Sequence, residues 1–402
     1  MADKPLVLSG PTCQRVVMSA YLRVPQTVLP PTPLHQDEVR EVFASQPDID
    51  RRAVRIVNAS FGGSGIDTRY TAITELGTEF AGEATFYDRS SNLLLSPGTS
   101  VRNELYVRTA TPMFVEAARQ ALAASDDIAP EEVTHVITVS CTGFHAPGPD
   151  FAIVTELGLR PGVERYHFGF MGCYASIPAL RAAAQFCHAD AEAVVLVVSA
   201  ELCTLHLRSS SDPDTIIASS LFADGAAGVL VTGRPPAPGV PGAELDSFAT
   251  AIAPDSVEHM AWTIGDHGFE MILSTAVPKV IEANIDDALG ALCAADEELT
   301  YARDCDDLAG TVTHWAVHPG GRDILDRVQH KVGLADAQLD AAREVLRTCG
   351  NMSSATVLFV IRRILLDGAS KTGERLIAMA FGPGLTMEGG VMTVLGGAGD
   401  GA

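Results

Sequence analysis

The stretch that decides the fold is Tyr166-His-Phe-Gly-Phe-Met-Gly-Cys-Tyr-Ala-Ser-Ile-Pro-Ala-Leu-Arg-Ala-Ala-Ala-Gln-Phe-Cys187. A short apolar run ends at Gly172, Cys173 follows at once, and an Ala-rich amphipathic stretch comes next. This pattern predicts a strand, a tight turn and a helix, with Cys173 on the first turn of the helix. Unpaired backbone N–H groups and the helix dipole favour thiolate over thiol at that position. The alternative is a packing role, because most unpaired cysteines are small buried hydrophobes.

Composition sets the class of protein. The chain has 402 residues, of which 47% are hydrophobic and 19% charged, as expected for one large α/β domain or two to three smaller ones. Its formal charge of −22 argues against binding a nucleic-acid backbone or an anionic membrane. The eight cysteines form no CxxC pair and no metal-ligand spacing. With neither a signal peptide nor a membrane-spanning apolar run, we expect a cytoplasmic protein with reduced thiols.

Apolar patterning predicts further elements along the chain. They are strands at 15–23, 134–140 and 193–199, helices that start near Gln36 and at 112–124, and a turn that feeds a strand at 221–232. The Gly-rich stretch 61–70 lacks both the GxGxxG and the Walker spacing, so it is a weak candidate for a phosphate site. Residues 233–242 hold four prolines in ten residues and predict a connector between a half at 1–235 and a half at 236–402.

The second half echoes the first in three places. Pro112-Met-Phe-Val-Glu-Ala-Ala resembles Pro278-Lys-Val-Ile-Glu-Ala-Asn, Val133-Thr-His-Val-Ile-Thr-Val resembles Val312-Thr-His-Trp-Ala-Val-His, and Gly172-Cys-Tyr-Ala-Ser-Ile-Pro resembles Gly350-Asn-Met-Ser-Ser-Ala-Thr. The last two offsets agree within one residue, and one loop insertion explains the difference of the first. Three echoes in the same order predict an internal duplication.

The duplication brings three chemically useful residues together. It places Cys173 and Asn351 at equivalent positions, each after a glycine at the head of a buried helix, and His318 at the end of the strand that matches the one running into Cys141. A cysteine beside an imidazole is an activated nucleophile suited to taking an acyl group from a thioester. The amide of Asn351 can bind an oxyanion beside His318.

Other interpretations of the same residues are open at this point. His318 alone could be a satisfied core histidine, and Asn351 alone could be a helix N-cap. The order Cys, His, Asn also occurs in papain-like cysteine hydrolases. Those enzymes carry their cysteine near the mature N-terminus in a different signature, whereas Cys173 lies in mid-chain.

The motifs resemble those of the type III polyketide synthases, the group of chalcone and stilbene synthases and their bacterial relatives. The resemblance spans residues 16–395. It rests on Gly172-Cys173, Glu201, Leu221-Phe-Ala-Asp-Gly-Ala-Ala, Ala253-Pro-Asp-Ser, His318-Pro-Gly-Gly, Gly350-Asn-Met-Ser-Ser-Ala and Phe381-Gly-Pro-Gly-Leu-Thr-Met-Glu. It implies an α/β protein with a duplicated thiolase-like fold of five layers, αβαβα, and a homodimer.

The resemblance also implies the reaction. Cys173 would take a starter acyl group from a coenzyme A thioester, and His318 and Asn351 would bind malonyl-CoA, promote its decarboxylation and stabilise the enolate. Repeated condensation would be followed by cyclisation to a pyrone or a resorcinol- or phloroglucinol-type ring. No metal or redox cofactor is implied, since the coenzyme A thioesters are substrates. The alternative within the fold is an initiating ketoacyl synthase, which performs a single condensation on an acyl carrier protein.

Matches to the family's pocket give further candidates. Phe222 matches an aromatic gatekeeper between the coenzyme A tunnel and the reaction chamber. The residues that match chamber positions are Cys141, Cys203, His206, Met271 and Ser353. Cys141, Cys203 and Met271 would make an apolar, adaptable chamber that suits an aliphatic starter.

Coenzyme A recognition departs from the plant pattern. Plant enzymes bind its phosphates with basic residues on an early helix, where this chain has Ile56, Ala59 and Gly63. The nearest cations, which are the candidate phosphate ligands, are Arg51, Arg52 and Arg55. The substitutions leave an acyl carrier protein open as an alternative donor of the starter.

Overall fold

The computed structural model describes residues 19–77, 80, 82–368 and 370–396. The helices are α1 (Gln36–Ala44), α2 (Arg51–Gly63), α3 (Thr99–Ala123), α4 (Pro149–Glu156), α5 (Ser176–Ala189), α6 (Pro213–Leu221), α7 (Val277–Cys293), α8 (Glu297–Asp304), α9 (Leu308–Thr311), α10 (Arg322–Val332), α11 (Asp336–Cys349) and α12 (Thr356–Leu366). Short 3-10 helices include η1 (Thr74–Leu76), η3 (Cys203–His206) and η4 (Ser353–Ala355).

The strands fall into one large sheet and three two-stranded sheets. The sheet contains β1 (Tyr21–Arg23), β2 (Gln26–Val28), β7 (His135–Ser140), β8 (Glu164–Gly169), β9 (Val194–Leu202), β10 (Asp224–Thr232), β11 (Gly242–Ile252), β14 (His314–Val317), β15 (Arg375–Gly382) and β16 (Thr386–Leu395). The small sheets pair β3 (Thr32–His35) with β4 (Thr68–Thr71) and, as hairpins, β5 (Tyr87–Asp88) with β6 (Leu93–Leu94) and β12 (Met260–Gly265) with β13 (Gly268–Leu273).

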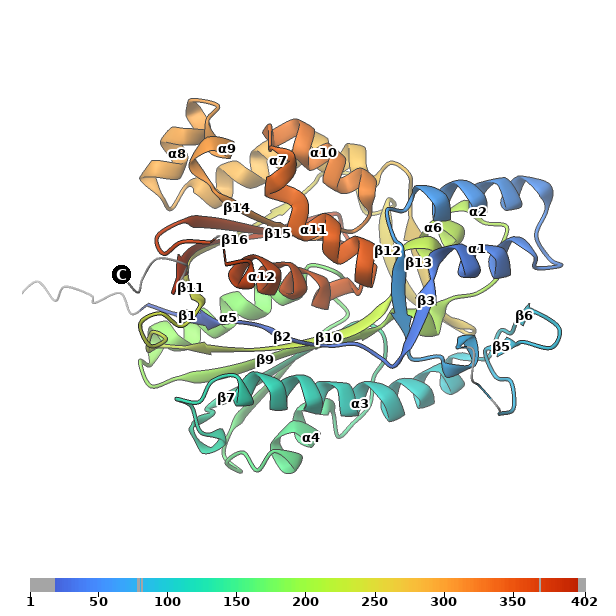
Figure 1. The fold of residues 1–402 in the computed structure, drawn as a ribbon, viewed down its shortest axis with the longest axis horizontal. Helices are drawn as coiled ribbons and strands as arrows, with labels where there is room; N and C mark the ends of the chain where they lie inside the picture. The colour runs from blue at the N-terminus through green and yellow to red at the C-terminus, as the bar shows by residue number, and fades with distance from the viewer. Residues whose placement is uncertain (1–18, 78–79, 81, 369, 397–402) are drawn as a thin grey trace, which may run out of the picture.

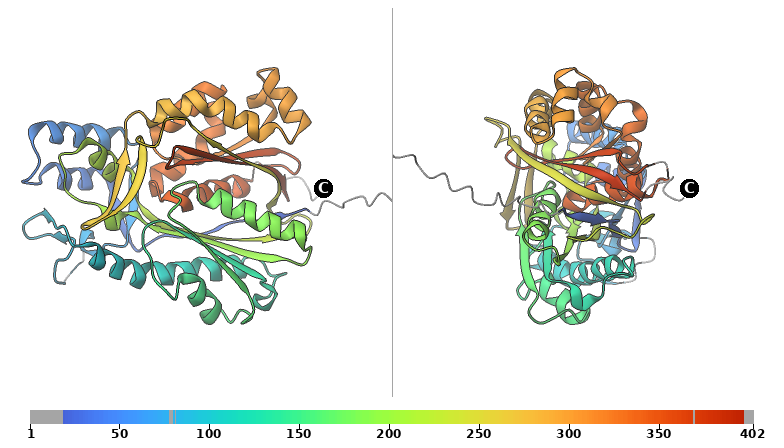
Figure 2. Two further views of the ribbon diagram at one scale, coloured as in Figure 1. Left: turned by 180° about the vertical axis from the view of Figure 1, so that it is seen from behind. Right: turned by 90° about the vertical axis from the view of Figure 1, so that its left-hand side faces the viewer.

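Helices and strands alternate in five layers. From top to bottom, Figure 1 shows α7 to α10, then β14 to β16, then α5 and α12, then β7, β9 and β10, and finally α3 and α4. Both views of Figure 2 keep α3 and the orange helices on opposite sides of the molecule. The central helices contact both halves of the sheet, since α5 packs on β9 and β16 while α12 packs on β15 and β10. This is the five-layered thiolase-like architecture that the family resemblance implies.

The sheet has the same pattern on either side of its middle. Its order is β14-β15-β16-β11-β1-β10-β9-β7-β8, with β2 beside β10. On one side of the central β1–β11 pair the order is β10, β9, β7, and on the other it is β16, β15, β14. On each side the first two strands join by antiparallel pairing, and the third is parallel to the second, β7 to β9 and β14 to β15. The echoed segments at Val133 and Val312 lead into β7 and β14, so the symmetry supports the predicted duplication.

The apolar sequence of α12 follows from its position. Thr-Val-Leu-Phe-Val-Ile at 356–361 is buried throughout. A helix that is apolar on all sides needs cover on all sides. Strands of both halves of the sheet provide that cover.

Two predicted boundaries are wrong. The helix predicted at 112–124 begins at Thr99 and passes through Pro112. Pro112 lacks one backbone N–H, but the helix packs along β9 and β10 with Tyr106 and Ala110 fully buried, and this packing overrides the local signal. Of the strand predicted at 15–23, Tyr21–Arg23 is strand, and residues 15–18 lie outside the described part.

Cys173 lies one turn ahead of the position that the sequence predicts. The helix starts at Ser176, and Cys173 belongs to a turn in which the N–H of Ala175 donates to the carbonyl of Gly172 at 3.1 Å. The predicted order of strand, turn and helix is otherwise present as β8, the turn and α5. The predicted Gly-rich loop at 61–70 is split, because its first residues end α2 and its last begin β4.

Candidate active site

The turn that carries Cys173 requires glycine at position 172. Gly172 has φ +86°, a conformation that other residues rarely adopt. A Cβ at Gly172 would lie 2.4 Å from Cδ of Pro383, inside the contact distance of two carbons. Gly172 therefore lets the chain turn against the segment at Pro383 and set the Cys173 side chain, 6% exposed, on a cavity.

Asn351 follows an equivalent glycine. Gly350 ends α11 with φ +72°, and Asn351 then forms a parallel bridge with Phe222. The N–H of Asn351 donates to Leu221 O at 3.0 Å, and the N–H of Ala223 donates to Asn351 O at 2.8 Å. The bridge joins the C-terminal end of α6 to the entry of α12, so Phe222 and Asn351 hold each other in place.

The orientation of the Asn351 amide is determined by its two neighbours. Oδ1 accepts from the Ser353 N–H at 2.9 Å, and Nδ2 donates to Gly320 O at 3.2 Å. The reversed orientation would set Nδ2 against an N–H and Oδ1 against a carbonyl. One N–H of the amide is thus used by Gly320, and the second is available to a ligand.

His318 comes directly after β14. Its backbone N–H donates to Met379 O at 2.7 Å, which extends the pairing of β14 with β15 by one residue. The side chain is 1% exposed, and neither ring nitrogen has a hydrogen-bond partner among the described residues. A buried histidine with both nitrogens unpaired is costly and points to a ligand that completes the site.

One cavity gathers the three residues. Cys173, His318 and Asn351 line it together with Phe222, Cys141, Met271 and Ser353. The strand end and the two helix-entry segments meet there, as the duplication predicts. The free volume is about 30 Å³, enough for one or two water molecules. Side chains must therefore move before an acyl chain can occupy it.

Burial keeps both reactive groups neutral. It raises the pKa of the Cys173 thiol to about 12, against a smaller opposing effect of a hydrogen bond with Ser353. Burial lowers the pKa of the His318 imidazole to about 3. The thiolate that the sequence favours is thus not the resting form, because desolvation outweighs the effect of the helix terminus. A neutral imidazole still offers one donor and one acceptor.

The predicted chamber residues divide between two cavities. Cys203 and His206 line a second cavity, also about 30 Å³, beside the first. Phe222, Met271 and Trp262 line both, so their side chains form the wall between the two. Trp262 also donates from Nε1 to Cys141 O at 2.8 Å, which fixes the β12–β13 hairpin over the cavities. The sequence pattern around Trp262 did not indicate this role.

His206 is engaged at both ring nitrogens. Nε2 lies 2.9 Å from Thr142 O and must donate to it, and Nδ1 accepts from the Phe269 N–H at 3.0 Å. The ring also stacks on Phe269 with centroids 4.2 Å apart. Burial lowers the pKa of His206 to about 3, so it stays neutral. His206 ties the hairpin to the end of β7 and contributes only its ring face to the cavity.

Glu201 organises the floor of the site. Fully buried, it accepts from the Cys141 N–H and the Thr142 hydroxyl, each at 2.9 Å, and from the Ser354 hydroxyl. Burial raises the pKa of Glu201, and these donors oppose the shift. The carboxylate therefore links the end of β7, which Cys141 follows, to the segment that enters α12, which holds Ser353. The Sγ of Cys141 and the Oγ of Ser353 lie 3.5 Å apart.

A larger cleft adjoins the cavity at Cys173. It measures about 330 Å³, and Gly320, Ile324 and Leu273 line both spaces. Ala59 and Gly63 of α2 line the cleft, as does Arg322 at the start of α10. Sequence reasoning missed Arg322, although it directly follows the His318-Pro-Gly-Gly segment.

The three predicted phosphate ligands lie farther out on α2. Arg51, Arg52 and Arg55 are exposed, and none of them lines the cleft. Arg55 precedes Ala59 by one helical turn, so its side chain is on the same stripe of the helix. Of the three arginines, Arg55 is therefore the nearest along α2 to a residue that lines the cleft.

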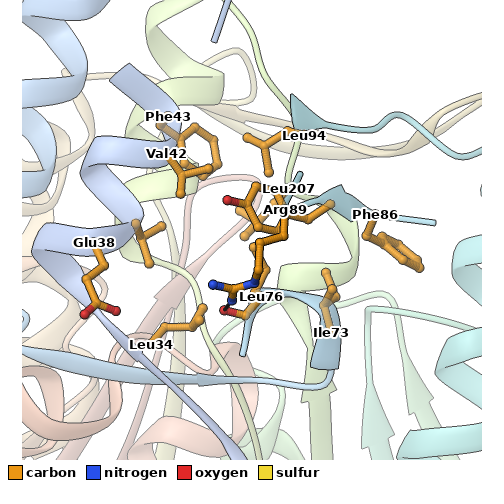
Figure 3. Close-up of a pocket in the computed structure, with 12 residues that line it drawn as sticks. Leu34, Glu38, Val42, Phe43, Ile73, Leu76, Phe86, Arg89, Leu94 and Leu207 are labelled. Atoms are coloured by element: carbon orange, nitrogen blue, oxygen red, sulfur yellow. Dashed lines mark hydrogen bonds between the residues drawn. The ribbon is translucent and has the colours of Figure 1, made fainter. Parts of the chain in front are cut away.

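A separate pocket lies between α1, η1 and the β5–β6 hairpin (Figure 3). It measures about 230 Å³ and is mostly apolar, with the Arg89 side chain extending across it. Arg89 donates to the carbonyls of Leu76 and Gly77. The pocket holds none of the predicted site residues, and no thiol or imidazole lines it.

The described residues offer no resident metal site. They contain no cluster of three or more His, Cys, Asp or Glu side chains suited to a metal ion. In the same part of the chain, no helix combines the length and apolar character needed to span a bilayer.

Comparison with known proteins gives consistent matches. The family model "Chalcone and stilbene synthases, N-terminal domain" matches residues 14–235, and the corresponding C-terminal domain model matches residues 244–396. The solved structure of PKS-I from the brown alga Ectocarpus siliculosus is 26% identical, with a TM-score of 0.81 over 93% of this chain and 98% of that one.

Two other solved structures show the same fold. The 1,3,6,8-tetrahydroxynaphthalene synthase of Streptomyces coelicolor A3(2), a bacterial type III polyketide synthase, is 24% identical, with a TM-score of 0.79 over 93% of this chain and 99% of that one. The C-terminal type III polyketide synthase domain of Steely1 from Dictyostelium is also 24% identical, with a TM-score of 0.78 over 94% of this chain and 99% of that one.

Proposed function

The chain belongs to the chalcone and stilbene synthase family and is a type III polyketide synthase, and on this premise we propose that Cys173, His318 and Asn351 are its catalytic residues. The observation that carries the assignment is their position on one buried cavity, where the described residues leave both nitrogens of His318 unpaired and one N–H of Asn351 free. The family match over both halves of the chain speaks against the ketoacyl synthase and papain-like alternatives.

The first step loads the starter. Cys173 attacks the carbonyl of an acyl-CoA, the carbon–sulfur bond to coenzyme A breaks, and the acyl group becomes a thioester of Cys173. Neutral His318 takes the thiol proton and returns it to the departing coenzyme A thiolate, so the step balances.

The second step extends the chain. Malonyl-CoA binds with its thioester carbonyl between His318 and Asn351, and loss of CO₂ leaves an enolate that their N–H groups stabilise. The enolate carbon attacks the acyl carbonyl, the bond to Cys173 breaks, and the thiolate takes up a proton. Transfer of the extended chain back to Cys173 starts the next round, and cyclisation to a pyrone or a resorcinol- or phloroglucinol-type ring ends the reaction.

We assign the remaining predicted residues around this centre. Phe222 separates the cleft from the cavity, since its neighbour Leu221 lines the cleft and Phe222 itself lines the cavity. Cys141, Met271 and Ser353 contact the growing chain, and Cys203 and His206 line the space beyond the wall. The cleft takes the pantetheine arm of coenzyme A, with Arg322 and Arg55 nearest to its phosphates.

We propose that the protein is a homodimer and that each chain consists of two thiolase-like halves. The sheet symmetry supports halves at 1–235 and 236–402. Among the described strands β8 is an unpaired edge, flanked by the exposed rings of Phe144 and Phe151, and a second copy would cover this surface. A cytoplasmic location stays a prediction, consistent with seven free cysteines among the described residues.

The test uses purified protein, malonyl-CoA and a panel of acyl-CoA starters, with products identified by mass spectrometry. We expect products extended by two or more malonyl units, and Cys173→Ala should lose covalent acylation. A single condensation that requires a malonyl carrier protein would overturn the assignment, as would full acylation of Cys173→Ala. Running the panel with acyl carrier protein thioesters as well identifies the starter donor.

A further inference from the structure

Arg69 is a buried cation beneath the bridge that joins Phe222 to Asn351. It lies in β4 with 0% exposure, within the Gly-rich stretch that sequence reasoning left without a function. Its guanidinium lies over the Phe61 ring, 5.6 Å from the centroid. No carboxylate in the described part of the chain is within ion-pair distance of it, and the nearby Asp224 offsets only part of the effect of burial, which lowers the pKa of Arg69 to about 10. A buried charge without an ion pair is costly, so its retention calls for an explanation.

The guanidinium of Arg69 holds the end of α6. Its Nη1 donates to Ser219 O at 2.7 Å and to Phe222 O at 2.6 Å. Carbonyls at a helix C-terminus lack intrahelical partners and carry partial negative charge, so a cation is favoured there. Arg69 therefore fixes where α6 ends and where the Phe222 backbone lies.

The stem of Arg69 supports the other strand of the bridge. A Cβ on Gly350 would lie 3.0 Å from the Cβ of Arg69 and 3.0 Å from that of Ala223, so Gly350 is enclosed between these two side chains. Asn351 comes next in the chain. Both strands of the Phe222–Asn351 bridge thus rest on one arginine side chain.

The segment that carries Arg69, β4 and the residue after it, also contacts the start of β10 just beyond Phe222. Asp224, two residues after Phe222, accepts from the Ala72 N–H at 2.7 Å and from the Thr204 N–H and hydroxyl at 2.8 and 2.6 Å. Arg69 and Ala72 lie three residues apart in the chain. Arg69 bonds to the Phe222 carbonyl and Ala72 bonds to the Asp224 carboxylate, so one short segment holds both residues.

From this geometry we infer that Arg69 is a positioning residue for decarboxylation and condensation. It acts through the Phe222–Asn351 bridge and sets the place of the Asn351 amide relative to His318. The inference rests on the proposed function of Asn351. Because a misplacement of about 1 Å costs up to about 100-fold in rate, loosening the bridge should slow the step that uses Asn351. Loading of Cys173 does not use that amide and should be spared.

The test compares two partial reactions in wild type and Arg69→Lys. Lysine keeps the charge, but its side chain is one bond shorter, so its ammonium falls short of the position from which Nη1 serves both carbonyls. Starter loading is followed as acylation of Cys173 by hexanoyl-CoA, using intact-protein mass spectrometry. Decarboxylation is followed as conversion of malonyl-CoA to acetyl-CoA. We expect decarboxylation to fall about 10- to 100-fold while the loading rate stays within about twofold.

Arg102 supplies a matched control. It is also fully buried, donates to the carbonyls of Leu205 and Leu207, and lies 5.7 Å from the centroid of the Phe86 ring. It does not touch the Phe222–Asn351 bridge. Arg102→Lys should lower the Tm by a similar amount and leave the ratio of decarboxylation to loading unchanged.

A second readout does not depend on activity. The N–H groups of Asn351 and Ala223 bond across the bridge, so their hydrogen exchange should accelerate in Arg69→Lys and not in Arg102→Lys. Equal loss of both partial reactions in Arg69→Lys, or unchanged exchange at these two amides, would overturn the inference. Absence of acylation in the wild type would instead overturn the proposed function, and exchange would still decide the role of Arg69.

Discussion

Replacing Asn351 with aspartate removes one hydrogen-bond donor with almost no change of shape. The Asn351 side chain is 2% exposed, and its Oδ1 accepts from the Ser353 N–H, a bond that the aspartate keeps. The Nδ2 becomes an oxygen, which loses both the bond to Gly320 O and the N–H free for a substrate. The substitution therefore keeps the packing and replaces the amide N–H groups with an ionisable carboxyl.

The expected effect on rate follows from the role of that donor. Loss of one oxyanion-hole donor costs about 10²- to 10³-fold in kcat, or about 2.7–4 kcal/mol of transition-state stabilisation. We expect malonyl-CoA decarboxylation by Asn351→Asp to fall by about that factor. The free energy of unfolding should also fall, by about 1–3 kcal/mol, because Gly320 O loses its donor. Acylation of Cys173 should continue at close to the wild-type rate.

The assay measures acetyl-CoA formed from malonyl-CoA and, separately, the mass of acylated protein. Asn284→Asp is a matched control, since Asn284 is half-buried on α7 and donates from Nδ2 to Val280 O at 2.8 Å, but it does not line the catalytic cavity. The control should keep both partial reactions. Decarboxylation within about threefold of wild type in Asn351→Asp would refute the donor role, and so would a parallel loss of loading.

Three other changes probe the surroundings. Burial raises the pKa of Asp224 to about 7, above the 3.8 of a free carboxyl, so the contribution of Asp224 to stability is greatest below about pH 4 and declines as the pH rises to 7. Asp224→Asn should remove this decline, which is on the order of 4 kcal/mol, as unfolding curves measured between pH 4 and pH 7 would show. Cys141→Ser should leave acylation at Cys173, as peptide mapping would show, because burial and, in addition, the nearby Glu201 carboxylate raise the pKa of the Cys141 thiol, and the Cys141 Sγ lies beside the Ser353 hydroxyl. His206→Ala leaves the Phe269 N–H without an acceptor and should lower the free energy of unfolding by about 1–3 kcal/mol and alter the product ratio, whereas unchanged products would contradict its link to the hairpin.

Local pattern and internal repetition were enough to predict how the three reactive residues meet. Strand β8, the turn at Gly172 and α5 follow from an apolar run, a glycine and an amphipathic stretch. The echo at Gly350 then implied that Asn351 enters the core in the same way as Cys173. These signals are strong because a repeated positive-φ glycine before a buried helix leaves few other geometries.

Other features depend on packing that no local pattern records. Pro112 signals a helix start, yet α3 runs through it because the face around Tyr106 is buried against the sheet. Arg69 lies in a polar stretch, and its two carbonyl partners are 150 and 153 residues away. The wall at Trp262 depends on how β12 and β13 lie over the end of β7. Each of these arises from contacts between segments far apart in the chain.

The charge states of Cys173 and His318 depend on burial, an effect that could not be judged from the sequence. A helix N-terminus stabilises a nearby anion by about 0.3–1 kcal/mol, and this favoured a thiolate at Cys173. Burial moves the pKa of Cys173 from 9 to about 12, a cost of roughly 4 kcal/mol for the charged form, which exceeds the stabilisation from the helix several-fold. The same burial holds His318 neutral. In the proposed reaction, charge on the sulfur and on the imidazole therefore develops together as the acyl carbonyl is attacked, where each charge stabilises the other.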